Sequence, residues 1–227
     1  MRIAALALVA LGLVACGTDN IIIQPPPPPP AEPPGTVIDA QGEPPNDWVN
    51  CGSGHFALYF NLAENEPFVG EIDGDTDANV PGADPIDPNA VPFWFDDHLA
   101  FSKYDVSLEF GPNWWPVDEG LSNDPRYFAT QWTSWLRVFN DNQNVQIVLA
   151  AETDVFITIG ENTEIVRSDV RYAPEVLDLP LNTGVYPVTI RYAQRKGQDG
   201  GFRFRVVNPP EQARICWPDF PDEVPAE

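Results

Sequence analysis

The chain has 227 residues, of which 34 are Asp or Glu and 12 are Lys or Arg, so its formal net charge is −22. This balance argues against nucleic acid as a partner, because binding phosphates requires a basic surface. The same charge keeps a protein soluble and makes divalent cations suitable partners.

The first element is an apolar segment of signal-peptide length. Residues 3–15 follow a short basic start and are too few to span a bilayer, which takes about 20 residues. The run Leu-Val-Ala-Cys at 13–16 resembles the lipobox of bacterial lipoproteins. The resemblance implies a signal peptide over residues 1–15, a lipid on Cys16 and, because Gly17 replaces Asp, anchoring in the cell outer membrane. An ordinary secretory signal is the alternative.

A proline-rich linker follows over residues 16–46. Six consecutive prolines at 25–30 favour a polyproline II strut of about 19 Å. We expect this linker to be a semi-rigid stalk that lifts a domain off the membrane. A proline-recognition peptide is the alternative.

The remaining residues, 47–227, are enough for one domain with a sizeable core. With Cys16 lipidated and the compartment oxidising, Cys51 and Cys216 are left as a disulfide pair that would join the start of this domain to its end. Two buried free thiols are the alternative.

Apolar residues alternate with polar ones within the domain, which is typical of strands. About eight or nine short strands separated by turn-forming residues predict an all-β fold, a sandwich or a barrel. The clearest alternations lie at 56–60, 106–110, 155–159, 188–192 and 202–206.

A long acidic insertion lies after the first strand. Its carboxylates alternate with a spacing close to that of calcium-binding loops, which supply several oxygen ligands, although Ala78 and Pro81 depart from the usual pattern. We expect Ca²⁺ to be held by Asp73, Asp75, Asp77, Asn79 and Asp84. A solvated acidic loop without a metal is the alternative.

Two further groups of side chains are candidates for binding. Trp114 and Trp115, with Asn113 beside them, could stack on a sugar, although core packing is the alternative. Aromatic and acidic residues at 93–98 offer a similar mix. Basic residues gather late in the chain and predict a partner-binding face on one hairpin, for which local ion pairs are the alternative; they include Arg191, Arg203 and Arg205.

Four segments, in order, resemble the PA14 domain, an antiparallel β-sandwich of bacterial toxins, glycosidases and adhesins: 54–61, 106–114, 128–136 and 181–192. The resemblance implies a PA14-like sandwich with a long loop insertion. Many sugar-binding members hold calcium with adjacent aspartates, whereas the matching stretch here has Glu152 and Asp154, which are not adjacent. We keep these two as ligand-contact candidates without carrying over the family's calcium lectin site.

No nucleophile elbow, zinc spacing or phosphate loop stands out, so we do not expect an enzyme. The sequence predicts an outer-membrane lipoprotein that binds glycan without catalysis, in adhesion. A structural lipoprotein that docks an envelope protein is the alternative. The two hypotheses make different predictions: glycan binding should depend on calcium, whereas docking of a protein should depend on Arg203 and Arg205.

Overall fold

The structure is a computed structural model that describes residues 42–62, 88, 92–112, 114, 127–141, 143–151, 153–161, 163–168, 172–194 and 201–219. These residues form two short 3-10 helices, η1 (Pro92–Trp94) and η2 (Asp96–His98), and eleven strands. The strands are β1 (His55–Asn61), β2 (Leu99–Asp105), β3 (Leu108–Phe110), β4 (Phe128–Val138), β5 (Gln143–Ala151), β6 (Asp154–Ile159), β7 (Thr163–Ser168), β8 (Glu175–Leu181), β9 (Gly184–Gln194), β10 (Phe202–Val206) and β11 (Ala213–Cys216). Within the described ranges no helix has the length and hydropathy needed to cross a membrane.

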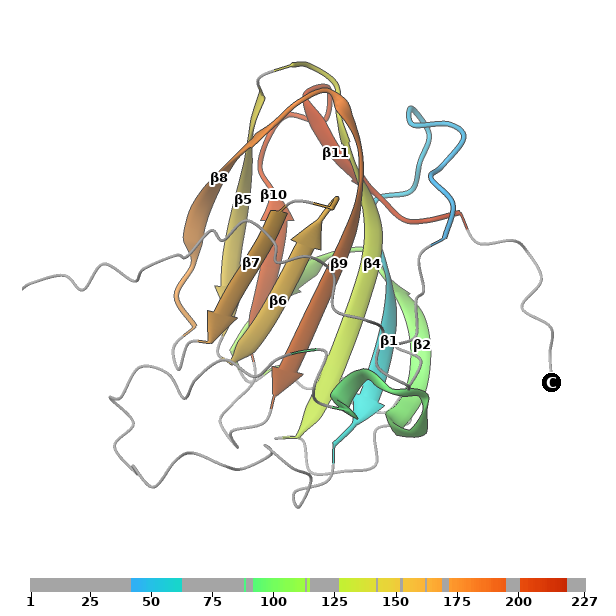
Figure 1. Cartoon of the computed structure of the whole chain (residues 1–227), viewed down its shortest axis with the longest axis vertical. Coiled ribbons are helices and arrows are strands. Elements are labelled where there is room, and N and C mark those ends of the chain that lie inside the picture. The colour runs from blue at the N-terminus through green and yellow to red at the C-terminus, as the bar shows by residue number, and fades with distance from the viewer. Residues whose placement is uncertain are drawn as a thin grey trace, which may run out of the picture.

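The strands form two sheets whose neighbours all run antiparallel (Figure 1). The larger sheet has the order β2-β1-β4-β9-β6-β7, with β11 also paired to β4, and the smaller has the order β3-β10-β5-β8. The prediction of an all-β antiparallel sandwich is confirmed. The strand count exceeds the eight or nine expected, because several strands lack a clean alternation in sequence.

The main core lies between the sheets. On β1, Ala57 and Tyr59 face this interior, whereas Leu58 and Phe60 belong to a second cluster on the outer face of the larger sheet. Both faces of β1 are therefore buried. Side chains alternate across a strand, so the apolar residues that alternate in the sequence share one face of β1: Phe56, Leu58 and Phe60. This face is the outer face of the larger sheet.

One edge of β4 is shared by two strands, and this explains how the ends of the domain meet. β1 pairs with the first half of β4, up to Phe56 opposite Thr133, and β11 pairs with the second half, from Cys216 opposite Trp135. The start of β1 and the end of β11 therefore lie next to each other. The disulfide Cys51–Cys216 forms here, with a Cα–Cα distance of 5.6 Å. The predicted pairing is confirmed.

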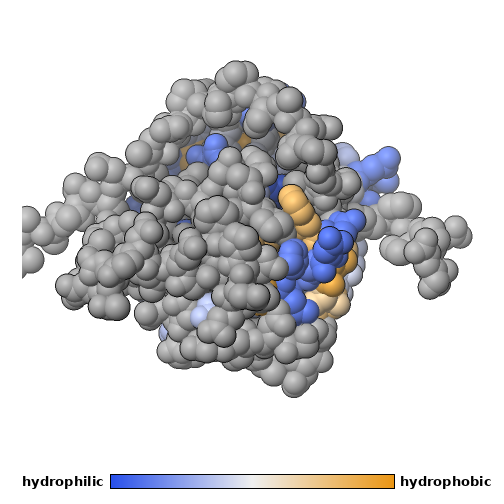
Figure 2. Space-filling model, turned by 60° about the horizontal axis from the view of Figure 1, so that its bottom comes forward, coloured by the Kyte–Doolittle hydropathy of each residue, from blue (hydrophilic) through white to orange (hydrophobic). Residues whose placement is uncertain are grey.

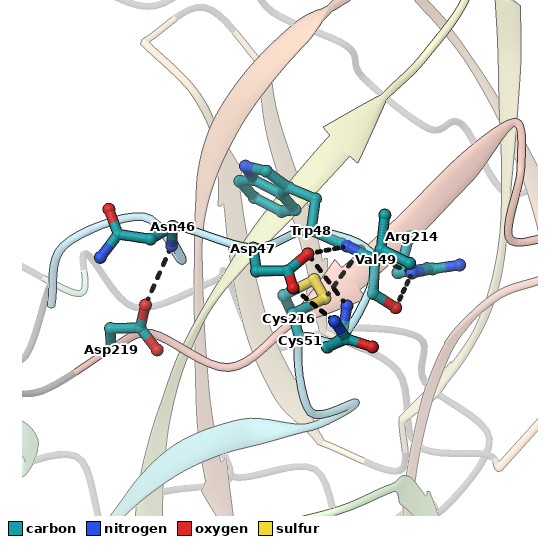
Figure 3. Close-up of a disulfide and its surroundings, with 9 residues drawn as sticks. Asn46, Asp47, Trp48, Val49, Cys51, Arg214, Cys216 and Asp219 are labelled. Carbon is teal, nitrogen blue, oxygen red and sulfur yellow. Dashed lines mark hydrogen bonds between the residues drawn. A yellow bond between two sulfur atoms is a disulfide. The ribbon is translucent and has the colours of Figure 1, made fainter.

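Residues 42–52 and 213–219, which we call the clamp, are held together by further contacts (Figure 3). Arg214 Nη1 donates to the carbonyl oxygens of Trp48 at 2.6 Å and Val49 at 3.2 Å. The backbone N–H of Trp217 donates to the carbonyl of Gly52 at 3.1 Å. A Cβ on Gly52 would lie 2.2 Å from the Trp217 ring, so only glycine allows this approach.

The sandwich has two unlike ends. At the clamp end, short turns join the strands, such as 106–107 between β2 and β3 and 182–183 between β8 and β9. At the opposite end, which we call the loop end, Asn61 of β1 lies opposite Phe128 of β4, which in turn lies opposite Gln194 of β9. The longest connections in the chain, β1 to η1 and β3 to β4, therefore begin and finish at the loop end.

Candidate functional site

The candidate metal and ligand residues fall in connections that start and finish at the loop end. The proposed calcium ligands, Asp73, Asp75, Asp77, Asn79 and Asp84, lie between β1 and η1, outside the described residues. Asn113, Trp115 and Glu152 also lie outside them, as does Cys16. Within the described ranges no three His, Cys, Asp or Glu side chains are grouped to hold a metal ion. The described side chains at this end include both hydrophobic and hydrophilic ones on one side of the molecule (Figure 2).

Trp114 is half-buried and packs against the main core. Its ring stacks on Phe110 at 4.0 Å between centroids and meets Phe128 edge-on at 5.2 Å. This is the core-packing alternative that the sequence left open. Ligand contact by Trp114 stays a prediction.

Asp154 is fully buried at the start of β6. Its neighbours Val155 and Ile157 face the main core, so Asp154 points to the outer face of the larger sheet. Trp114 packs on the opposite face, between the sheets. The structure therefore does not bring Asp154 and Trp114 into one site, and a ligand at the surface does not reach the Asp154 carboxylate.

The prediction of a basic hairpin is wrong. Arg191 lies on β9 of the larger sheet, whereas Arg203 and Arg205 lie on β10 of the smaller sheet, and the two strands are not paired. Arg203 and Arg205 both form ion pairs with Glu109, at 3.9 and 3.5 Å. Partner binding by these arginines stays a prediction, but they share no surface with Arg191.

Arg191 lies against the second cluster, which includes the aromatic residues Phe93 and Trp94 of η1. Its Nε donates to the side-chain oxygen of Gln131 at 3.1 Å, and its guanidinium lies 5.8 Å from the centroid of the Trp94 ring. Trp94 is 1% exposed, and its Nε1 donates to the carbonyl of Thr130 at 3.1 Å. Phe93 and Trp94 therefore cover the sheet and present no open aromatic platform.

A buried carboxylate in the main core was not singled out by the sequence. Asp105, 8% exposed at the end of β2, accepts hydrogen bonds from Tyr59 Oη at 2.5 Å and Trp132 Nε1 at 2.8 Å. Lys103 Nζ lies 3.6 Å from its other oxygen. These contacts satisfy the carboxylate and tie β1, β2 and β4 together.

A cleft opens between the sheets at the clamp end, and the sequence also missed it. It has a volume of 260 Å³ and lies between β1 and β11 on one side and β3 and β10 on the other. His55, 5% exposed, lines it, and burial lowers the pKa of this imidazole to about 3. The available signal was a histidine in phase with Ala57 and Tyr59 on a strand. We call this cavity the His55 cleft; it is lined by Ser53, His55, Val106, Ser107, Leu108, Phe204, Arg205, Val206, Asn208, Pro210, Ala213, Arg214 and Ile215.

The chain was compared with known proteins. No protein-family profile matches it, and no curated protein matches it. Among solved structures, an anti-sigma factor domain-containing protein is similar at 12% identity and a TM-score of 0.45, over 73% of this chain and 47% of that one. The A domain of Epithelial Adhesin 6 from Candida glabrata, solved with Galb1-3GlcNAc, is similar at 13% identity and a TM-score of 0.45, over 82% and 98%.

The GH31 alpha-xylosidase of Xanthomonas citri is similar at 8% identity and a TM-score of 0.41, over 80% of this chain and 18% of that one. The chain thus spans less than half the length of the first structures it resembles. These likenesses are too distant to carry an argument about function.

Proposed function

We propose that this protein is a lipid-anchored domain of the outer membrane that binds glycan without catalysis, through the loop end of its sandwich. The observation that supports this proposal is topological. The clamp brings the entry and exit of the domain to one end, and the proposed stalk precedes the clamp in the chain. The long connections, with their acidic and aromatic residues, belong to the other end and would face away from the membrane.

The donor set of the acidic insertion fits a hard divalent cation. Asp73, Asp75 and Asp77 offer carboxylate oxygens at alternate positions, and Asn79 and Asp84 add further oxygens. Calcium bound there would order an insertion whose like charges repel each other. Sugar hydroxyls bind where carboxylate and amide oxygens converge beside an aromatic surface, which is the composition of these connections.

The direct test is a broad glycan array probed with the full-length protein in detergent, once with calcium and once with chelator. We expect binding in calcium that is lost in chelator. The double variant Asp73→Asn with Asp75→Asn should weaken binding at least tenfold, whereas Arg205→Ala, on the smaller sheet, should leave it unchanged. No binding in either arm would overturn the proposal and favour the alternative of an assembly lipoprotein.

A further inference from the structure

Two arginines lie side by side on the outer face of the larger sheet, at the clamp end. The register of β4 and β11 places Arg137 directly opposite Arg214. Their strand neighbours Leu136, Val138 and Ala213 belong to the main core, so both arginine side chains project from the other face of the sheet. Directly opposed residues of an antiparallel pair have Cβ atoms about 4.5–5.5 Å apart. We call these two residues the arginine pair.

The arginine pair has no carboxylate partner among the described residues. Arg214 uses Nη1 to donate to the carbonyl oxygens of Trp48 and Val49 (Figure 3). The guanidinium of Arg137 lies 5.6 Å from the centroid of the Phe139 ring, and its Nε has no acceptor in the part of the chain that the structure describes. Both side chains are half-buried, so two partly desolvated positive charges stand together without a counter-charge there.

This arrangement contrasts with the rest of a chain that has 34 acidic and 12 basic residues. Lys103 pairs with Asp105, and both Arg203 and Arg205 pair with Glu109. Like charges directly opposite each other destabilise a sheet, so an anion held between the two guanidiniums would remove this cost. The residues around the arginine pair by register are uncharged: Val185, Trp135 and Cys216.

The carboxylates of the clamp are used by its backbone. Asp47 accepts hydrogen bonds from the N–H groups of Val49 at 2.9 Å and Asn50 at 3.3 Å. Asp219 accepts one from the N–H of Asn46 at 3.1 Å. Among the described contacts, neither carboxylate forms an ion pair with the arginine pair. The counter-charge therefore has to come from outside the clamp.

The geometry of two adjacent guanidiniums favours a phosphate group. Each guanidinium is a planar fork that donates two parallel hydrogen bonds to an oxyanion. One carboxylate has two oxygens and fits one fork, whereas a phosphate group has enough oxygens to accept from two forks at once. Arg214 keeps its remaining nitrogens available, because only Nη1 donates to the clamp carbonyls.

We propose that the arginine pair is an anion site that binds a phosphate group between its two guanidiniums. The phosphate can belong to a membrane lipid headgroup or to a soluble ligand. The first source rests on the proposed function, because the lipid-anchored stalk would attach at the clamp. A headgroup bound there would hold the clamp end against the membrane and keep the loop end facing outward.

The test is isothermal titration calorimetry of the full-length protein in dodecyl maltoside, a detergent without charge. The protein is titrated separately with inorganic phosphate, dihexanoyl phosphatidylglycerol and acetate. We expect at least one of the two phosphate compounds to bind with a Kd of about 0.1–10 mM, and acetate to bind at least tenfold more weakly. Binding should weaken as the salt concentration rises.

Two variants that each remove one positive charge separate a site from a general effect of charge. Arg137→Gln removes one fork of the arginine pair and breaks none of the hydrogen bonds that hold the clamp, so it should weaken binding at least tenfold at an unchanged melting temperature. Arg205→Gln, on the smaller sheet, is the matched control and should leave the Kd unchanged.

The preferred probe identifies the source. Tighter binding of phosphatidylglycerol indicates a lipid headgroup, and binding of inorganic phosphate alone indicates a soluble ligand. The absence of binding by both, an equal loss in the two variants, or acetate binding as tightly as phosphate would overturn the proposal. These outcomes are independent of the glycan array, which tests the loop end.

Discussion

The two ends of the sandwich differ in how the chain is held. At the clamp end a disulfide, a β-bridge between Glu43 and Asp219 and the Arg214 hydrogen bonds join segments far apart in sequence. At the loop end two of the connections, 62–91 and 111–127, are long and carry more acidic than basic residues. Among the described residues, the disulfide and the Arg214 hydrogen bonds lie where the stalk would attach, while the candidate metal and ligand residues belong to connections at the other end.

The aromatic core lies between these ends and links them. Trp132 stacks on Phe202 at 4.9 Å, and its Nε1 reaches Asp105 toward the clamp end. Trp114 stacks at 5.9 Å from Trp132 on the side of the loop end.

The largest expected effect is loss of the disulfide. Replacing both Cys51 and Cys216 with serine should lower the free energy of unfolding by about 2–5 kcal/mol, because the bridge closes a loop of 165 residues in the unfolded chain. Urea denaturation measures this change. Cys16→Ser is the matched control and should leave the stability of the domain unaltered. A loss below about 1 kcal/mol in the double variant would mean that the clamp holds without its covalent bond.

The second prediction concerns the core toward the loop end. Trp114→Ala should destabilise the domain by about 3 kcal/mol, because it removes a ring that stacks on Phe110 and packs against Phe128. Trp114→Phe should recover most of this loss. If Trp114→Ala abolished glycan binding while leaving the melting temperature unchanged, Trp114 would be a ligand platform instead of a core residue.

The third prediction is a pH dependence that originates at the clamp end. Burial lowers the pKa of His55 from its ordinary value of 6.5 to about 3 in the folded protein, so between about pH 6.5 and pH 3 the unfolded state binds a proton that the folded state does not. His55 should therefore contribute a loss of up to about 1.4 kcal/mol per pH unit as pH falls from about 6 toward 3. The charged groups around it include Asp105, opposite on β2, and Arg205 and Arg214, which line the same cleft.

The matched variant for this measurement is His55→Phe, which keeps the ring and removes the titration. Its unfolding free energy should fall less steeply as the pH is lowered than that of the original protein. The contributions of the carboxylates are the same in both proteins, so they cancel when the two curves are subtracted. Parallel curves for the two proteins would show that folding does not lower the pKa of His55.

The smallest expected effect is at the outer face of the smaller sheet. Arg205→Ala should change stability by less than about 1 kcal/mol, because the side chains of Arg205 and Glu109 are 55% and 38% exposed and water screens their ion pair. If Arg205→Glu released an envelope protein that co-purifies with the original chain, the assembly alternative would replace the glycan proposal.

The sequence was sufficient for the fold class and the disulfide. Alternation at 155–159 and 188–192 reflects strands with one face in the main core, and Cys51 and Cys216 were the two cysteines left once Cys16 was assigned to the predicted lipid anchor. The strand expected at 56–60 is confirmed as β1, although its alternating residues lie on the outer face of the sheet. Val106 was expected in a strand and is instead exposed in a turn.

Tertiary pairing could not be derived from the same pattern. Residues 188–206 were expected to form one hairpin, but the chain crosses from the larger sheet at Gln194 to the smaller sheet at Phe202. The alternation of apolar and polar residues predicts a strand but does not specify which sheet the strand joins. The His55 cleft was missed for a similar reason, since its walls come from four strands, two in each sheet.

The most direct test of the division into two ends uses the imidazole NMR signals of the two histidines, His55 at the clamp end and His98 at the loop end. The ligand is a glycan selected on the glycan array. We expect this glycan, added to the full-length protein in calcium, to move the imidazole signal of His98 and to leave that of His55 in place. Chelator should reverse the shift. A glycan that binds but moves His55 alone would place recognition at the clamp end and contradict the proposed function of the loop end.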